Sequence, residues 1–276
     1  MIRVMRRTQR PSVIVVALVI LVPLMMFPFA VMVTTALKSN QDLFSQSFFP
    51  HQLDWANFLT LWSKVGLGQY LVNSVIIAGG SGVAATMVAV LAGYSVSRYR
   101  YRGRTLFIGL MLATQMFSPV VFLLPLFRVF STYGLLDTQF GLIIVNTGFN
   151  MPFAVWLMSR YLATVPKELE EAAYVDGATE FGAMIRVVAP LAAPGIVVSF
   201  IFSFMSGWNE FTFALTFMTS QQKMPVTLGL YEFVGHFSVQ WNYLMGACLL
   251  AVIPPAILFI AIQRYLIGGL TTGSLK

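Results

Sequence analysis

Polar residues that could do chemistry are few in this sequence, because only 10% of its residues are charged. Many of the acidic ones lie in a single segment, residues 166–190, which combines glutamates with alanines and a glycine. A Trp-Asn-Glu run at residues 208–210 lies inside an apolar stretch, and Asn146 and Asn150 lie four residues apart in another. Inside a membrane, such groups normally face a neighbouring helix or a water-filled cavity. They therefore indicate contacts between helices or a polar path for a solute.

Catalytic and nucleotide-binding motifs are missing from the sequence. It contains no Gly-x-x-x-x-Gly-Lys-Ser/Thr loop for phosphates, no His-Glu-x-x-His and no Gly-x-Ser-x-Gly. The single cysteine, Cys248, lies in an apolar run, and His51 and His236 lie in different loops, so their spacing builds no metal site. The sequence therefore predicts a chain that is not an enzyme and binds no metal or cofactor. If ATP and Mg²⁺ drive its action, partner subunits bind them.

The composition is that of a membrane protein. Of the 276 residues, 58% are hydrophobic, and the mean hydropathy is +0.79, far above the usage of soluble globular proteins. The net charge of +7 could suggest nucleic acid as a partner. Here the basic residues lie at the ends of apolar runs, which is typical of chains that span a lipid bilayer. We therefore expect no nucleic-acid partner.

Six apolar stretches are long enough to cross the bilayer as helices. They are residues 13–37, 70–96, 105–127, 139–159, 194–218 and 243–267. A helix needs roughly 20 residues to cross about 30 Å of hydrocarbon. We therefore expect an all-α membrane protein with six transmembrane helices, forming a single domain over residues 1–276, with a long loop at residues 160–193.

The distribution of basic residues predicts the orientation. Thirteen of the 17 Lys and Arg residues fall in the N-terminal segment, the loop around residues 98–104, the 160–193 loop and the C-terminal segment. Because basic residues accumulate on the cytoplasmic side, we expect both termini and the 160–193 loop to be cytoplasmic. The four arginines between residues 98 and 104 resemble a phosphate-binding cluster, but the same rule explains them.

The segment from Pro166 to Pro190 predicts two short helices. Pro166 can open the first, whose first turns are acidic, as the helix dipole favours. Gly177 is a plausible end, because glycine tolerates positive φ. Hydrophobic residues spaced i, i+3, i+4, i+7 then predict an amphipathic helix that ends at Pro190. The members of this stripe are Phe181, Met184, Ile185 and Val188.

This segment resembles the EAA loop of permease subunits of binding-protein-dependent ABC importers. The matching residues are Glu171, Ala172, Ala173, Asp176, Gly177, Ala178, Phe181, Ile185 and Pro190. In that family the loop forms coupling helices that occupy a groove of the cytoplasmic ATPase. The resemblance implies the type I ABC importer permease fold with cytoplasmic coupling helices. It implies ATPase coupling by Glu168, Glu171, Ala172, Ala173, Asp176, Gly177, Phe181 and Pro190.

Other stretches are similar to the maltose-type carbohydrate permeases. They are residues 34–38, 55–58 and 208–211, and the tail at 263–276, which departs from the family pattern at Ser274 and Leu275. The resemblance implies a bacterial cytoplasmic (inner) membrane subunit that imports a sugar or oligosaccharide. It also implies as partners a second homologous permease, two cytoplasmic ATPase subunits and an extracytoplasmic solute-binding protein.

A substrate pathway is expected along the fourth and fifth apolar stretches. The candidate residues are Trp208, Asn209, Glu210, Asn146 and Asn150. Glu210 could contact the solute, pair with a partner subunit or relay protons, and a single acidic residue is weak support for the last. Asn146 and Asn150 could bond a neighbouring helix or line the path.

Two other functions are compatible with parts of the sequence. One is an importer for a non-sugar solute, such as a glycerol phosphodiester or an oligopeptide. An anionic solute would require a fixed cation in the path, and only Arg128, at the end of a stretch, could supply it. The other is a self-sufficient proton-coupled transporter or a membrane enzyme. The sequence disfavours both of these, because it has neither paired intramembrane charges nor a catalytic motif.

Overall fold

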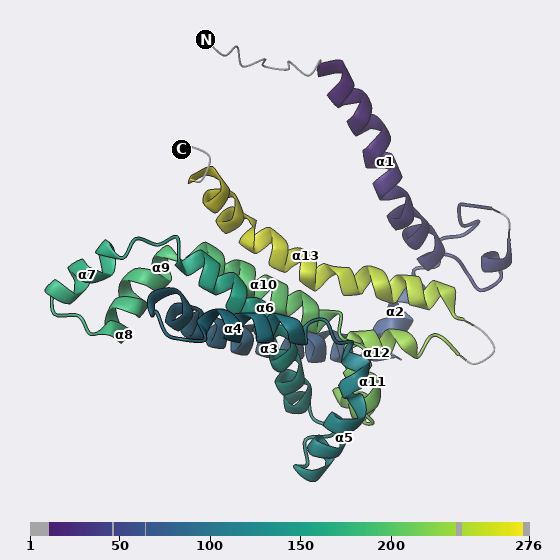
Figure 1. The fold of residues 1–276 in the computed structure, drawn as a ribbon. Coiled ribbons are helices and arrows are strands. Elements are labelled where there is room, and N and C mark those ends of the chain that lie inside the picture. The colour runs from purple at the N-terminus through teal and green to yellow at the C-terminus, as the bar shows by residue number, and fades with distance from the viewer. Residues whose placement is uncertain (1–10, 46, 64, 236–238, 273–276) are drawn as a thin grey trace. The chain divides into compact units, whose positions relative to one another are not determined.

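The computed structural model describes residues 11–45, 47–63, 65–235 and 239–272. Over these residues the regular structure is helical, apart from one isolated antiparallel bridge between Val234 and Val239 (Figure 1). The elements are α1 (Pro11–Ala36), η1 (Asp42–Phe44), α2 (Ala56–Ser63), α3 (Leu67–Arg98), α4 (Arg104–Thr114), η2 (Pro119–Phe122), α5 (Leu123–Thr132), α6 (Gln139–Leu162), α7 (Glu168–Val175), α8 (Glu180–Ala183), the π-helix η3 (Met184–Val188), α9 (Ala189–Leu191), α10 (Ala193–Trp208), α11 (Thr212–Phe217), η4 (Gln221–Lys223), α12 (Val226–Tyr231) and α13 (Trp241–Thr272).

Among the described residues, four helices are long and apolar enough to cross a membrane: α1, α3, α6 and α13. Two bent pairs of helices meet the same criteria only when each pair is taken together, which would give up to six spans. The prediction of an all-α membrane protein is confirmed. The predicted orientation is based in part on the N-terminal arginines and on the end of the tail. These residues lie outside the described part of the chain.

The stretch at residues 105–127 is not one straight helix. It contains α4 and η2 and runs into α5, and the two halves of this pair meet at an angle of 91°. Proline explains the break, because Pro119 has no N–H and disfavours a helical conformation of the residue before it. That residue, Ser118, is extended, with ψ 135°.

The stretch at residues 194–218 is also interrupted. Helix α10 has 16 residues, about 24 Å at 1.5 Å per residue, which is shorter than the hydrocarbon core. A break at residues 209–211 separates it from α11. At its other end, α10 is bent by 79° from the helical run Glu180–Leu191. The expected continuous span is therefore a short helix with a sharp bend before it and a break after it.

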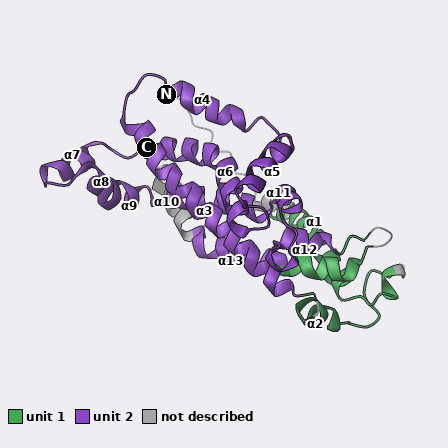
Figure 2. Cartoon of the chain, turned by 90° about the horizontal axis from the view of Figure 1, so that it is seen from below, with its two compact units in different colours: residues 1–65, 233–250 green, residues 66–232, 251–276 purple. Residues whose placement is uncertain are grey.

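The chain divides into two compact units (Figure 2). The first unit comprises residues 1–65 and 233–250. Within this unit, Asn57 of α2 is hydrogen-bonded to the end of α1. Its Nδ2 donates to the carbonyl oxygens of Ala36 and Lys38, each at 3.0 Å. Asn242 Nδ2 donates to Asn57 Oδ1 at 3.4 Å, which links the start of α13 to α2.

The second unit, residues 66–232 and 251–276, has a core in which α3 packs against α6 and α10. Small residues make these contacts close, as is usual between membrane helices. A Cβ at Gly93 would lie 2.9 Å from Met158 Cβ, and one at Gly195 would lie 2.5 Å from the Tyr161 ring. Glycine at these positions lets α6 approach its two neighbours.

Replacing Gly93 by alanine should therefore lower the stability of the assembled protein. The added Cβ would lie only 3.0 Å from the Ser159 backbone nitrogen, and overpacking of this kind costs about 1–3 kcal/mol. The measurement is the thermal unfolding midpoint of the purified complex. Gly79→Ala on the same helix is a matched control, because a Cβ there has nothing within 4 Å. Equal midpoints for the two variants would contradict a close approach at Gly93.

Candidate functional site

The loop between α6 and α10 folds into two short helical runs, the α7–α9 segment (residues 167–191). Helix α7 begins at Glu168 after an N-cap at Lys167, two residues later than the expected opening at Pro166. Glutamate, leucine and alanine favour a helix, and the acidic first turn matches its dipole. The helix ends where Gly177 takes φ 83°, the positive value that the sequence predicts. The Ala178 N–H then donates to the Ala173 carbonyl oxygen at 2.9 Å, which closes the turn.

The second run is not the single amphipathic stripe that the spacing suggested. Thr179 caps α8, its Oγ1 accepting from the Gly182 N–H at 3.1 Å, and the chain then widens into the π-helix η3. Met184 and Val188 are buried, but Phe181 and Ile185 are 63% and 49% exposed. The expected end at Pro190 is also wrong, because the run continues to Leu191. The stripe therefore splits between an inner and an outer face.

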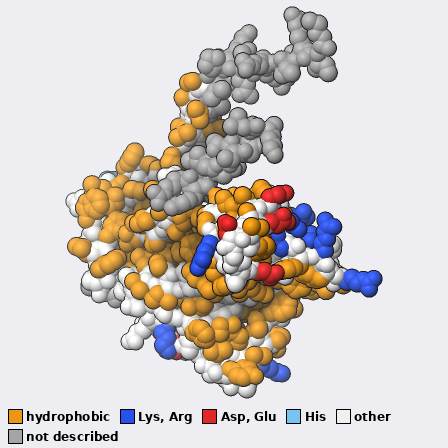
Figure 3. Space-filling model, turned by 90° about the vertical axis from the view of Figure 1, so that its left-hand side faces the viewer, with side chains coloured by type: hydrophobic (Ala, Val, Ile, Leu, Met, Phe, Trp, Pro, Cys, Tyr) orange, Lys and Arg blue, Asp and Glu red, His pale blue; other side chains and the backbone are white. Residues whose placement is uncertain are grey.

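The outer face of the α7–α9 segment is both apolar and acidic. Figure 3, which views the molecule from this end, shows hydrophobic side chains with acidic and basic ones close by. The exposed apolar side chains are those of Leu169, Ala172, Val175, Phe181 and Ile185, and the exposed acidic ones are those of Glu168, Glu171, Asp176 and Glu180. Ala173 is half-buried. Exposed apolar groups rimmed by charge are typical of a protein-binding surface.

A buried ion pair holds α7 against α3. Arg98 Nη2 lies 2.5 Å from Glu170 Oε1, with side chains 7% and 5% exposed. The same nitrogen donates a hydrogen bond to the Val165 carbonyl oxygen at 3.0 Å. The other carboxylate oxygen of Glu170 accepts from the Tyr94 hydroxyl at 2.9 Å. The sequence explained Arg98 by the excess of basic residues on the cytoplasmic side and Glu170 by the acidic first turn of a helix. In the structure these two residues form a specific contact between distant parts of the chain.

A second contact joins the end of α3 to α8. The Tyr99 hydroxyl donates to Glu180 Oε2 at 2.8 Å, and this hydrogen bond raises the pKa of the Tyr99 phenol. Beneath both contacts, an apolar cluster includes Val155 and Met158 of α6 together with Met184 and Val188 of the segment. The α7–α9 segment is therefore held to α3 and α6 over its whole length.

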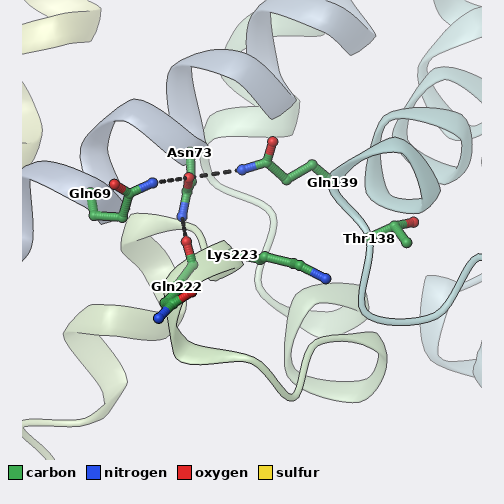
Figure 4. A pocket seen from close by; sticks show the side chains of 6 residues that line it. All are labelled: Gln69, Asn73, Thr138, Gln139, Gln222 and Lys223. Carbon is green, nitrogen blue, oxygen red and sulfur yellow. Dashed lines mark hydrogen bonds between the residues drawn. The ribbon is translucent and has the colours of Figure 1, made fainter.

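The opposite ends of α3 and α6 carry a polar network around Asn73, which is fully buried (Figure 4). Its Nδ2 donates to the carbonyl oxygens of Gln222 and Met224, each at 2.9 Å. Its Oδ1 accepts from Gln69 Nε2 at 3.0 Å and from Gln139 Nε2 at 2.8 Å. All of its hydrogen-bonding capacity is used, so Asn73 holds the loop around η4 rather than offering groups to a ligand. A polar pocket of about 710 Å³ lies beside it.

Asp137 holds the other side of the same loop. Its Oδ1 accepts from the Thr219 and Ser220 backbone N–H groups at 2.9 and 2.8 Å. Its Oδ2 accepts from the Ser220 hydroxyl and lies 3.4 Å from Lys223 Nζ. Partial burial raises the pKa of Asp137, but these hydrogen bonds and Lys223 lower it further than burial raises it, well below its ordinary value of 3.8.

The structure does not bring the five expected pathway residues together around one cavity. Asn146 and Asn150 are buried, and Asn150 Nδ2 donates to the Ser203 carbonyl oxygen of α10 at 3.4 Å. Trp208 is buried and stacks on Phe204, with ring centroids 5.8 Å apart. These three residues pack between helices in the conformation described.

The remaining two, Asn209 and Glu210, lie at the break between α10 and α11. Asn209 is exposed and donates from Nδ2 to the Met205 carbonyl oxygen at 2.8 Å. The Glu210 carboxylate accepts from the backbone N–H groups of Phe213 at 2.6 Å and Ala214 at 3.0 Å. Glu210 therefore caps α11, and its charge is stabilised by the start of that helix.

No group of three or more His, Cys, Asp or Glu side chains that could hold a metal is found among the described residues. The arrangement joins an exposed surface to α3 through the Arg98–Glu170 pair and to α6 through the apolar cluster. Arg98, Tyr94 and Glu170 make this connection. Apart from the opposite charges of Arg98 and Glu170, nothing in the sequence indicated that these residues would meet.

Known proteins are similar to this chain over most of its length. A family model described as "Binding-protein-dependent transport system inner membrane component" matches residues 85–271. The probable ABC transporter permease protein YurM of Bacillus subtilis (strain 168) is 33% identical over 91% of this chain and 83% of its own length. The melibiose/raffinose/stachyose import permease protein MelC of the same organism is 31% identical over 98% of both chains. The trehalose/maltose transport system permease protein MalG of Thermococcus litoralis is 28% identical over 95% of this chain and 96% of its own.

A solved structure has the same fold. It is a chain of a bacterial ABC transporter involved in the import of the acidic polysaccharide alginate. The TM-score is 0.79 with 23% sequence identity, over 92% of this chain and 95% of that chain. The prediction of a type I ABC importer permease fold is confirmed.

Arg98→Ala should detach the α7–α9 segment from α3, because it leaves the buried Glu170 carboxylate without its cation. Breaking a buried pair in this way costs about 3–5 kcal/mol. The double variant Arg98→Met/Glu170→Gln should recover most of this loss, because no unpaired charge remains. The measurements are thermal unfolding of the assembled complex and the rate of proteolysis within residues 167–191. Arg160→Ala is the control, since Arg160 is exposed. Additive losses in the double variant would contradict the pairing.

Proposed function

Since the chain belongs to the family of binding-protein-dependent transport system inner membrane components, we propose that it carries out one half of an ATP-driven sugar import. With a second, homologous permease it forms the translocation pathway for a sugar or oligosaccharide that an extracytoplasmic binding protein delivers. Two cytoplasmic ATPase subunits bind and hydrolyse ATP, because the sequence of this chain has no phosphate-binding loop. The chain lies in the inner membrane with both termini and the α7–α9 segment in the cytoplasm.

The observation that supports this proposal most is the construction of the α7–α9 segment. Its outer face presents Phe181, Ile185 and the Glu171–Ala173 residues, and its inner face is joined to α3 by the Arg98–Glu170 pair. An ATPase groove that receives the outer face can therefore move α3 and α6 as the ATPase subunits close. Rigid-body motion of packed helices is a common way to switch between two states. Here it would switch the pathway from inward-facing to outward-facing.

The sugar class is proposed from the relatives. Their names describe import of melibiose, raffinose and stachyose, and of trehalose and maltose. Neutral sugars are bound by hydrogen-bonding groups and by aromatic rings that stack on their faces, and a Trp-Asn-Glu run offers both. Of the five pathway candidates, Asn209 and Glu210 are the two that the break between α10 and α11 leaves accessible. Trp208, Asn146 and Asn150 would reach the path only after the helices shift.

Gly177→Val tests the coupling role. A left-handed conformation costs an ordinary residue about 1–2 kcal/mol, and φ at this position is 83°. The strain should displace the Glu171–Ala173 face while leaving the membrane helices assembled. We expect weaker co-purification of the ATPase subunits, or ATP hydrolysis that no longer responds to the loaded binding protein.

Two further variants make this test specific. Gly177→Asn should retain coupling, because asparagine tolerates the left-handed region and a Cβ there meets nothing within 4 Å. Ala173→Leu should impair coupling by adding bulk at a face that we propose to be a close contact. Wild-type ATPase association and stimulation in both Gly177→Val and Ala173→Leu would refute the proposed docking surface.

Glu210→Gln tests the pathway. Glutamine keeps one oxygen that can accept from the N–H groups at the start of α11, so the fold at the break should survive. If the carboxylate contacts the solute, uptake should fall while assembly and basal ATPase activity stay near the wild type. Thr227→Val is the control, because Thr227 Oγ1 donates to the Glu210 carbonyl oxygen at 2.7 Å and supports the same break without the carboxylate. Equal loss of uptake in both variants would assign Glu210 to the break rather than to the solute.

A further inference from the structure

The arginines between α3 and α4 divide into two kinds. Arg98 is buried in its pair with Glu170. Arg100 and Arg102 are exposed and Arg104 is half-buried. Within the described part of the chain, no carboxylate lies within ion-pair distance of these three. Three positive charges are therefore left uncompensated in one short loop.

Two of these arginines line a pocket. It has a volume of about 470 Å³, and its walls are Arg100, Tyr101, Gly103, Arg104, Thr105 and Leu106. Two guanidinium groups on one pocket suit a phosphate, because arginine donates paired hydrogen bonds to its oxygens. The pocket therefore offers the chemistry of a phosphate site.

An exposed apolar surface begins directly beside the pocket. No residue of α4 is buried. Leu106 and Leu110, one turn apart on the same face, are 65% and 59% exposed, and Phe107 is 44% exposed. Tyr99 and Tyr101, also exposed, lie just before the helix, and tyrosine is enriched where a membrane meets water. A basic pocket thus adjoins an apolar helix face that lipid can cover.

We propose that this pocket binds the phosphate of an anionic phospholipid, with the acyl chains lying along Leu106 and Leu110 of α4. The combination favours a lipid over a protein partner, because both halves of an amphiphile are matched within two helical turns. Basic pockets at the ends of transmembrane helices are known to hold anionic head groups. The site is separate from the pathway candidates, and Tyr99 beside it is hydrogen-bonded to Glu180 of the α7–α9 segment.

The test uses the complete importer, purified with its partner subunits in detergent and titrated with phosphatidylglycerol, phosphatidylcholine or inorganic phosphate. Bound lipid is counted by native mass spectrometry. Arg100→Gln/Arg104→Gln should weaken phosphatidylglycerol binding about 25-fold, at about fivefold for each arginine removed from an anionic surface. Arg128→Gln/Arg160→Gln removes the same charge elsewhere and should leave this binding unchanged. Arg100→Lys/Arg104→Lys should recover part of the affinity, which shows that the loop is still folded.

Several results would overturn the proposal. Equal affinity for phosphatidylglycerol and phosphatidylcholine would remove the role of charge. An equal loss in the Arg128→Gln/Arg160→Gln control would reduce the effect to net charge. Inorganic phosphate that displaces the lipid at equal concentration would identify a soluble phosphate as the ligand. Loss of a partner subunit from the Arg100→Gln/Arg104→Gln complex, with lipid binding unchanged, would assign the arginines to a protein interface.

Discussion

The buried contact between Arg98 and Glu170 is the constraint on which the proposed mechanism depends. A carboxylate and a guanidinium in an apolar surrounding are stable only together, because each alone would carry a large desolvation cost. Tyr94 and the Val165 carbonyl oxygen supply the further hydrogen bonds that such a pair needs. The pair therefore holds α7 against α3, and in the proposed mechanism a force on the exposed face of the α7–α9 segment would reach the membrane helices through it.

Breaks in the helices are the second theme of the structure. Backbone groups that a break leaves free inside a membrane need partners from the protein. Glu210 supplies them at the start of α11. At the bend after α4, Gln115 Nε2 donates to the Phe149 carbonyl oxygen of α6 at 2.6 Å, which holds the bend against that helix. Polar side chains in apolar stretches are thus used first to permit changes of direction. Glu210 could contact the solute and also cap α11, so the two roles are compatible.

Local patterns predicted what local physics controls. The end of α7 at Gly177 followed from the conformational freedom of glycine, and the acidic first turn from the helix dipole. The same reasoning failed in the second run, where Phe181 of α8 and Ile185 of the π-helix η3 lie on the outside while Met184 and Val188 of η3 stay inside. The bend after α4 could be anticipated from Pro119, yet its angle of 91° could not. That angle depends on packing against neighbouring helices.

The sequence by itself determined that this protein is a helical membrane protein, where its apolar stretches lie and which loop is acidic and rich in alanine. Hydropathy, charge position and residue propensities are properties of short windows, so they can be read without a fold. Only the tertiary structure shows that Glu170 faces Arg98 rather than solvent. It also shows that Asn73 holds the loop around η4 and that Asp137 accepts hydrogen bonds from the backbone N–H groups of residues 219 and 220. These pairings join residues far apart in the chain, and only the packing of α3, α6 and α10 brings them within hydrogen-bonding distance.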